Sequence, residues 1–237
     1  MSLPDGLLAR PFAHRGLWSP AGPPENSLAA FEAAVGGGYG VELDVRLSAE
    51  GEAVVFHDPT LERMTEAQGQ VRERTAEELG ALTLKGSVER IPTLEQALGL
   101  IAGRAPVLVE LKTRAGEEGP LERRVADLLE TYRGAAAALS FNWRAIGLLA
   151  DERPRLPRGL NSSDHVDQSA DVVPADPGRV LRGIDDARPH FLSLGKELCR
   201  GDRLSPLPTV AWTLRSPAGQ SAVRHASDTF MFERYRP

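Results

Sequence analysis

Cysteine is nearly absent from the sequence, with Cys199 the single occurrence in 237 residues. One cysteine cannot form an internal disulfide, so a reducing compartment is the default. The sequence also has no long hydrophobic run and no basic, apolar leader at its start, which excludes a stable membrane-inserted segment. These absences together predict a cytoplasmic protein.

Clusters of basic residues are also missing, and lysine occurs only at positions 85, 112 and 196. The formal net charge is −5, and without a basic patch nucleic acid is excluded as a partner. Hydrophobic residues make up 41% of the chain and charged residues 26%, as in an ordinary globular protein. A chain of this length can bury a sizeable core as a single α/β domain.

Predicted strands and helices alternate along the chain. The expected strands are 12–16, 39–48, 53–56, 106–112, 136–141, 156–161, 191–194, 209–214 and 228–232. The expected helices are 28–35, 75–82, 93–101, 120–132, 143–150, 175–187 and 218–226. About eight strand–helix repeats predict a parallel sheet closed as a (β/α)8, or TIM, barrel. The last outer helix is missing or truncated, because only residues 233–237 follow the final strand.

The strand Gly40-Val-Glu-Leu-Asp-Val-Arg46 places two carboxylates on one face. Side chains of a strand alternate between faces, so Glu42 and Asp44 point the same way while the apolar residues between them point oppositely. Two buried carboxylates need a counter-charge, and Mg2+ or Ca2+ takes carboxylate oxygens readily. The alternative is a strand whose charged face is exposed to water.

Further ionisable residues fall at the ends of other predicted strands. His14 and Arg15 follow the first strand, His57 follows strand 53–56, and Glu110 and Lys112 share a face late in strand 106–112. Reacting groups in TIM barrels lie at the carboxyl ends of the strands. Three carboxylates suit a hard divalent cation better than zinc, and Arg15 and Lys112 suit a phosphoryl group. The two histidines can transfer protons near neutral pH.

Six short motifs occur in order along the chain and strongly resemble the glycerophosphodiester phosphodiesterase family. They are His14-Arg15-Gly16, Pro24-Glu25-Asn26-Ser27, Glu42-x-Asp44, His57-Asp58, Glu110-x-Lys112 and Trp212-Thr213. The resemblance implies one TIM-barrel domain over residues 1–237, with a small insertion after the second strand at about 60–90. It implies one divalent cation, Mg2+ or Ca2+, held by Glu42, Asp44 and Glu110.

The same resemblance implies roles for the remaining site residues. His14 and His57 would be the acid/base pair, and Arg15 and Lys112 would bind the phosphate. Trp212 is expected to contact the substrate or to form a pocket wall, and Asn26 or Ser27 to cap the following helix. The implied reaction is hydrolysis of a glycerophosphodiester, a small-molecule substrate, to sn-glycerol 3-phosphate and an alcohol.

The chain departs from the family pattern at three places. Ser27 stands where threonine is usual, Leu214-Arg215 stands where Val-Asn is commoner, and the closing Asp-Gly-Ile-x-Thr-Asp is replaced by residues 228–233, which end in Glu233. We expect these changes to alter the far rim and the alcohol preference without touching the metal or histidine positions. Two other functions stay open. One is a lysophospholipase D-like lipid phosphodiesterase, which needs an apolar groove, and the other is a non-catalytic barrel that binds phosphate metabolites.

Overall fold

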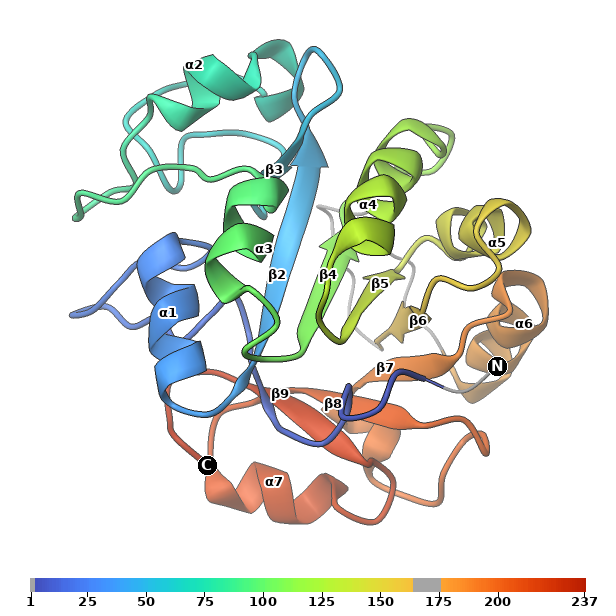
Figure 1. Cartoon of the computed structure of the whole chain (residues 1–237). Coiled ribbons are helices and arrows are strands. Elements are labelled where there is room, and N and C mark those ends of the chain that lie inside the picture. The colour runs from blue at the N-terminus through green and yellow to red at the C-terminus, as the bar shows by residue number, and fades with distance from the viewer. Residues whose placement is uncertain (1–2, 164–175) are drawn as a thin grey trace.

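Eight parallel strands form a closed barrel in the computed structural model, which describes residues 3–163 and 176–237 (Figure 1). The strands are β1 (Phe12–Ala13), β2 (Gly40–Leu47), β4 (Val107–Leu111), β5 (Ala136–Ser140), β6 (Arg158–Ser162), β7 (Phe191–Gly195), β8 (Thr209–Leu214) and β9 (Thr229–Phe232). Ala13 pairs in parallel with both Val41 of β2 and Phe232 of β9, which closes the ring. The predicted TIM barrel is confirmed.

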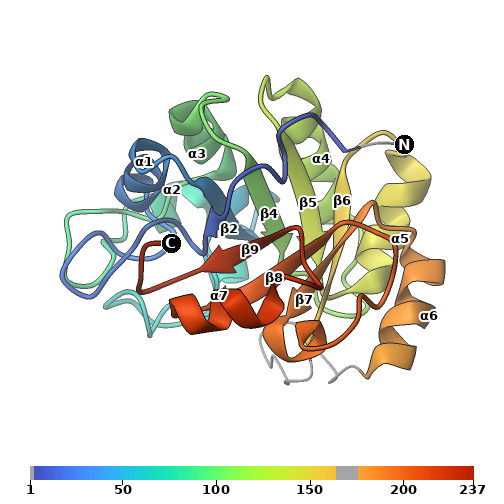
Figure 2. The same cartoon turned by 90° about the horizontal axis from the view of Figure 1, so that it is seen from below.

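Helices lie outside the strands, as the two views show (Figure 1, Figure 2). They are α1 (Leu28–Gly36), α3 (Leu94–Ile101), α4 (Pro120–Thr131), α5 (Trp143–Glu152), α6 (Pro177–Ala187) and α7 (Pro217–Val223). A short 3-10 helix, η2 (Lys196–Cys199), follows β7 in place of an α-helix, and residues 233–237 form no helix after β9. This agrees with the expectation for residues 233–237.

Some element boundaries differ from the sequence expectation. β1 ends at Ala13 because the chain turns through left-handed backbone at Arg15 (φ 59°) and Gly16 (φ 80°). The helix expected over 175–187 begins at Pro177, after the N-cap Asp176, and Ala175 lies outside the described residues. α7 ends at Val223, three residues short of the expected end at Ala226.

An apolar layer fills the barrel near the amino ends of the strands. Its buried members include Phe12, Leu108, Phe191 and Met231. A Cβ at Gly159 would lie 2.3 Å from the ring of Phe191, so glycine is what allows that ring to fit. The inward-facing residues further along the strands therefore rest on a packed apolar floor.

The segment between β2 and α3 carries the antiparallel strand β3 (Ala53–Val55), the 3-10 helix η1 (Val71–Glu73) and α2 (Ala76–Gly80) (Figure 1). It has an apolar cluster of its own, which includes Phe56, Leu61, Val71 and Leu79. The segment therefore packs as a small unit beside the end of β2. No helix among the described residues has the length and apolar character needed to cross a membrane.

Candidate active site

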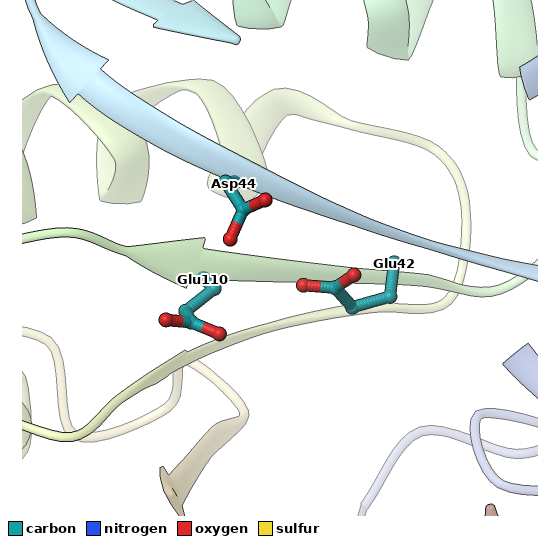
Figure 3. A group of neighbouring side chains, drawn as sticks. All are labelled: Glu42, Asp44 and Glu110. Atoms are coloured by element: carbon teal, nitrogen blue, oxygen red, sulfur yellow. The ribbon is translucent and has the colours of Figure 1, made fainter. Parts of the chain in front are cut away.

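Three carboxylates converge inside the barrel (Figure 3). Glu42 and Asp44 come from β2, and Glu110 of β4 lies directly opposite Asp44 in the strand register. One oxygen atom from each of the three lies within 4.8 Å of the others, and all three residues are buried. The predicted convergence of these acids is what the structure shows, and the alternative of a charged face exposed to water is excluded.

The pKa values of Glu42 and Asp44 are shifted in opposite directions. Burial raises the pKa of Glu42 well above its usual value, and the charges of Asp44 and Glu110 raise it further. Burial also acts to raise the pKa of Asp44, but Lys112 and other nearby cations hold it well below its usual range. The Nζ atom of Lys112 lies 3.0 Å from Asp44 Oδ1 and also pairs with Glu110.

The donor set fits a hard divalent cation. Among the described residues, no hydrogen-bond donor reaches the buried Oε1 atom of Glu42. A buried carboxylate oxygen without a donor is costly, and a cation on it would relieve both that cost and the repulsion between neighbouring acids. An all-carboxylate set of this kind is typical of Mg2+ or Ca2+ rather than zinc.

The loop between β1 and α1 adds contacts to two of these acids. The backbone N–H of Arg15 donates to Glu42 Oε2 at 2.9 Å, and its Nε atom lies 3.2 Å from Asp44 Oδ2. Asn26 Nδ2 donates to Asp44 Oδ2 at 2.8 Å, whereas Ser27 caps α1. Asn26 therefore orients Asp44 and is not the helix cap. The Pro24–Ser27 motif was the one signal in the sequence that could have revealed this.

His14 contacts Glu233, which was expected to affect only the far rim of the barrel. Its Nδ1 atom lies 3.1 Å from Glu233 Oε2, and Arg215 Nε donates to Glu233 Oε1 at 2.5 Å. The expectation that the departures at Arg215 and Glu233 leave the histidine positions untouched is wrong. β8 and β9 are neighbours in the barrel, and β9 lies beside β1, so the closing residues reach His14.

His57 has a similar environment. Its Nδ1 atom lies 2.6 Å from Asp58 Oδ1, and Asp58 is in turn paired with Arg63. Burial lowers the pKa of both His14 and His57. A carboxylate at Nδ1 favours the tautomer with a proton there, which leaves Nε2 of each ring to exchange a proton.

Both histidines, Arg15, Glu110 and Lys112 line one cavity of about 290 Å³. Its lining residues are His14, Arg15, His57, Glu110, Lys112, Phe141, Asn161, Ser163, Trp212, Thr213, Arg215 and Met231. Trp212 packs edge-on against Phe141, with ring centroids 5.5 Å apart. Asn161 was not singled out from the sequence, because an asparagine in a predicted strand has no distinctive pattern.

The fold and these residues define a TIM barrel of the enzymatic type, with ionisable groups gathered at the carboxyl ends of β1, β2 and β4. Comparison with known proteins narrows this class. The chain belongs to the glycerophosphoryl diester phosphodiesterase family, which it matches over residues 14–233.

Individual relatives agree with this assignment. The chain is 40% identical to a glycerophosphodiester phosphodiesterase of Caldanaerobacter subterraneus subsp. tengcongensis over 213 residues, which cover 85% of this chain and 84% of the relative. A glycerophosphodiester phosphodiesterase of Thermotoga maritima has a similar structure, with a TM-score of 0.72, 25% identity and coverage of 93% of this chain and 92% of that one.

An Oleispira antarctica phosphodiesterase, solved in complex with the product sn-glycerol-3-phosphate, has the same fold. Its TM-score is 0.78 at 24% identity, with 94% of this chain and 92% of that chain covered. At this identity the likeness extends to the fold only.

Proposed function

We propose that this protein hydrolyses glycerophosphodiesters to sn-glycerol 3-phosphate and an alcohol, with the help of one divalent cation, Mg2+ or Ca2+. Family membership supports the reaction class. The observation that carries the assignment is the meeting of three buried carboxylates and two imidazoles at one end of the barrel. An acidic cluster alone would not distinguish an enzyme from a binding protein.

Glu42, Asp44 and Glu110 would hold the cation. When bound, the cation would supply positive charge that polarises the phosphoryl oxygens. Arg15 and Lys112 both line the cavity and would bind the non-bridging phosphate oxygens. Trp212 would pack against the organic part of the substrate, since its ring forms part of the cavity wall.

His14 and His57 would transfer the protons. One imidazole accepts the proton of the attacking oxygen, and the other donates a proton to the departing alcohol. The attacking oxygen belongs either to water or to the neighbouring hydroxyl of the glycerol, and the second route passes through a cyclic phosphate. Both rings suit these roles, because a carboxylate at Nδ1 orients each of them.

A panel of glycerophosphodiesters assayed with Mg2+, with Ca2+ and with EDTA tests this function. We expect one metal to support alcohol release and EDTA to abolish it. Release of sn-glycerol 3-phosphate, detected by a coupled dehydrogenase, identifies which ester bond is cleaved. Absence of metal-dependent release from every diester would instead favour a barrel that binds phosphate metabolites without catalysis.

A second cavity supports a lipid phosphodiesterase as the second candidate function. It has a volume of about 440 Å³, lies beside η1 and the start of α4, and has Lys112 in its lining, as the first cavity does. Leu47, Pro59, Val71 and Leu121 give it apolar surface suited to a hydrocarbon chain. A lysophospholipid in the same assay panel, compared with glycerophosphocholine, distinguishes the two substrates.

We also infer that residues 1–237 form one catalytic domain, which consists of the barrel and the insertion at about 60–90. The insertion packs against β3 through Val54, which belongs to its apolar cluster. We propose a cytoplasmic location, because the single cysteine, Cys199, is buried and forms no disulfide.

A further inference from the structure

Arg63 extends from the insertion to two acidic residues on different loops. Its Nε atom donates to Asp58 Oδ2 at 2.5 Å, and Nη2 donates to Asp58 Oδ1 at 3.0 Å. Nη2 also donates to Glu25 Oε1 at 2.6 Å, and Nη1 donates to Glu25 Oε2 at 3.1 Å. One guanidinium therefore binds two carboxylates, each through two contacts.

Each of these carboxylates also contacts a residue of the candidate active site. Asp58 Oδ1 lies 2.6 Å from Nδ1 of His57, and Glu25 Oε1 accepts a hydrogen bond from Arg15 Nη1 at 2.9 Å. Asp58 follows β3, whereas Glu25 precedes α1, so the two contacts arise from separate parts of the chain. Arg63 is the cation that joins them.

Only an arginine suits this position. A guanidinium presents five N–H donors in a planar fork and can bind two carboxylates at once, whereas an ammonium is a single point of charge. Glu25 is only 7% exposed, so loss of Arg63 would leave a buried carboxylate with Arg15 as its remaining cation. The side chain of Arg63 is 45% exposed, which leaves it accessible to solutes.

We propose that Arg63 is a positioning residue that fixes the orientation of both His57 and Arg15, and that the insertion contributes to hydrolysis through it. This inference rests on the proposed function for its kinetic consequences. Arg63 acts through Asp58 on the imidazole that transfers a proton, and through Glu25 on the guanidinium that binds phosphate. Its loss therefore affects turnover and substrate binding together.

The kinetic test compares Arg63→Ala, Arg63→Lys and a control, Arg104→Ala. Arg104 makes a similar two-contact pair with Glu32, at 2.9 and 2.6 Å, on an exposed surface of the protein. We expect Arg63→Ala to lower kcat/KM by about 10- to 100-fold, with kcat reduced and KM raised, because small misplacements of reacting groups are costly. Arg104→Ala should stay within about twofold of the wild type, as expected for a surface pair.

Two further variants separate the effect of the Asp58 contact from the effect of the Glu25 contact. Asp58→Asn should mainly lower kcat, and Glu25→Gln should mainly raise KM, while Arg63→Ala shows both changes. Arg63→Lys should recover only part of the loss, because an ammonium cannot bind both carboxylates in the same way. Added guanidinium ion should partly restore Arg63→Ala and have no such effect on the wild type. If Arg63→Ala fails to fold by circular dichroism, Arg63→Gln takes its place, because it is uncharged and too short to bind both carboxylates but keeps a polar side chain at this position.

A measurement that does not depend on turnover tests this inference independently of the proposed function. In protein labelled with 15N-histidine, NMR reports which ring nitrogen of His57 carries the proton. We expect one Nδ1–H tautomer in the wild type and in Arg104→Ala, and averaged signals in Arg63→Ala. Unchanged His57 signals together with unchanged kcat and KM in Arg63→Ala would overturn the role of Arg63. A wild type that cleaves no diester would overturn the proposed function, and the NMR comparison would still decide the positioning role.

Discussion

The two imidazoles of the site share one arrangement at the residue scale. Each has a carboxylate at Nδ1: Glu233 for His14 and Asp58 for His57. Each carboxylate is bound in turn by an arginine. Burial acts to raise the pKa of Glu233, but the hydrogen bond and charge of His14, and then Arg215, lower it to about 2, so this carboxylate stays ionised. Both rings are thereby fixed before the substrate arrives, which reduces the cost of orienting them.

Replacing either histidine tests its place in catalysis. His14→Ala and His57→Ala should each lower kcat by about 10² to 10⁴, because a positioned acid or base contributes that much to rate. Metal binding, measured by calorimetry, should remain, since neither imidazole belongs to the carboxylate cluster. His225→Ala, at an exposed position, is the control and should behave as the wild type. Near-normal turnover in either site variant would remove that histidine from the mechanism.

At the scale of elements, close contact between neighbouring strands builds the floor below the site. Gly159 of β6 faces the ring of Phe191 in β7, and a Cβ there would approach the ring to 2.3 Å. Gly159→Ala should therefore lower the free energy of unfolding by about 1–3 kcal/mol through overpacking. Urea denaturation measures this change.

A second glycine provides the matched control for that experiment. A Cβ at Gly99 in α3 would meet no atom within 4 Å, so Gly99→Ala only improves helix propensity. We expect it to raise the free energy of unfolding by about 0.5–1 kcal/mol. Equal effects of the two substitutions would show that Phe191 does not restrict position 159.

For the whole molecule, the acidic cluster links metal binding to stability. Any ligand that binds the folded state alone stabilises it, by about 2.7 kcal/mol at a concentration 100-fold above its dissociation constant. Thermal unfolding should therefore shift upward with Mg2+ or Ca2+ and return with EDTA. Glu42→Gln removes a buried acid whose pKa is raised, so it should lose the metal-dependent shift without losing stability in metal-free buffer. Persistence of the full shift in this variant would exclude Glu42 as a ligand.

Part of this site follows from local pattern. Glu42 and Asp44 share a face because a strand alternates with period two, and Glu110 and Lys112 do so for the same reason. Their meeting required only that the two strands be neighbours in a parallel barrel, as β2 and β4 are. The order of strands and helices predicted that barrel.

Other parts of the site depend on the loops. Arg15 and Asn26 both adopt left-handed backbone, with φ of 59° and 57°, and this turns their side chains toward β2. Such conformations are uncommon for residues other than glycine, so sequence pattern does not predict them. The contacts of Arg63 with Glu25, 38 positions apart in sequence, depend on how the insertion folds back over the β1–α1 loop.

Short-range periodicity and motifs in the amino-acid sequence are enough to predict the barrel, the family and the acids, imidazoles and cations that face its interior. The residues that contact and orient these groups become visible when the chain is folded. Glu233, 219 positions from His14, reaches its ring because closing the barrel brings β9 against β1. Contacts of that kind form when the ends of the chain meet in space, and no local pattern records them.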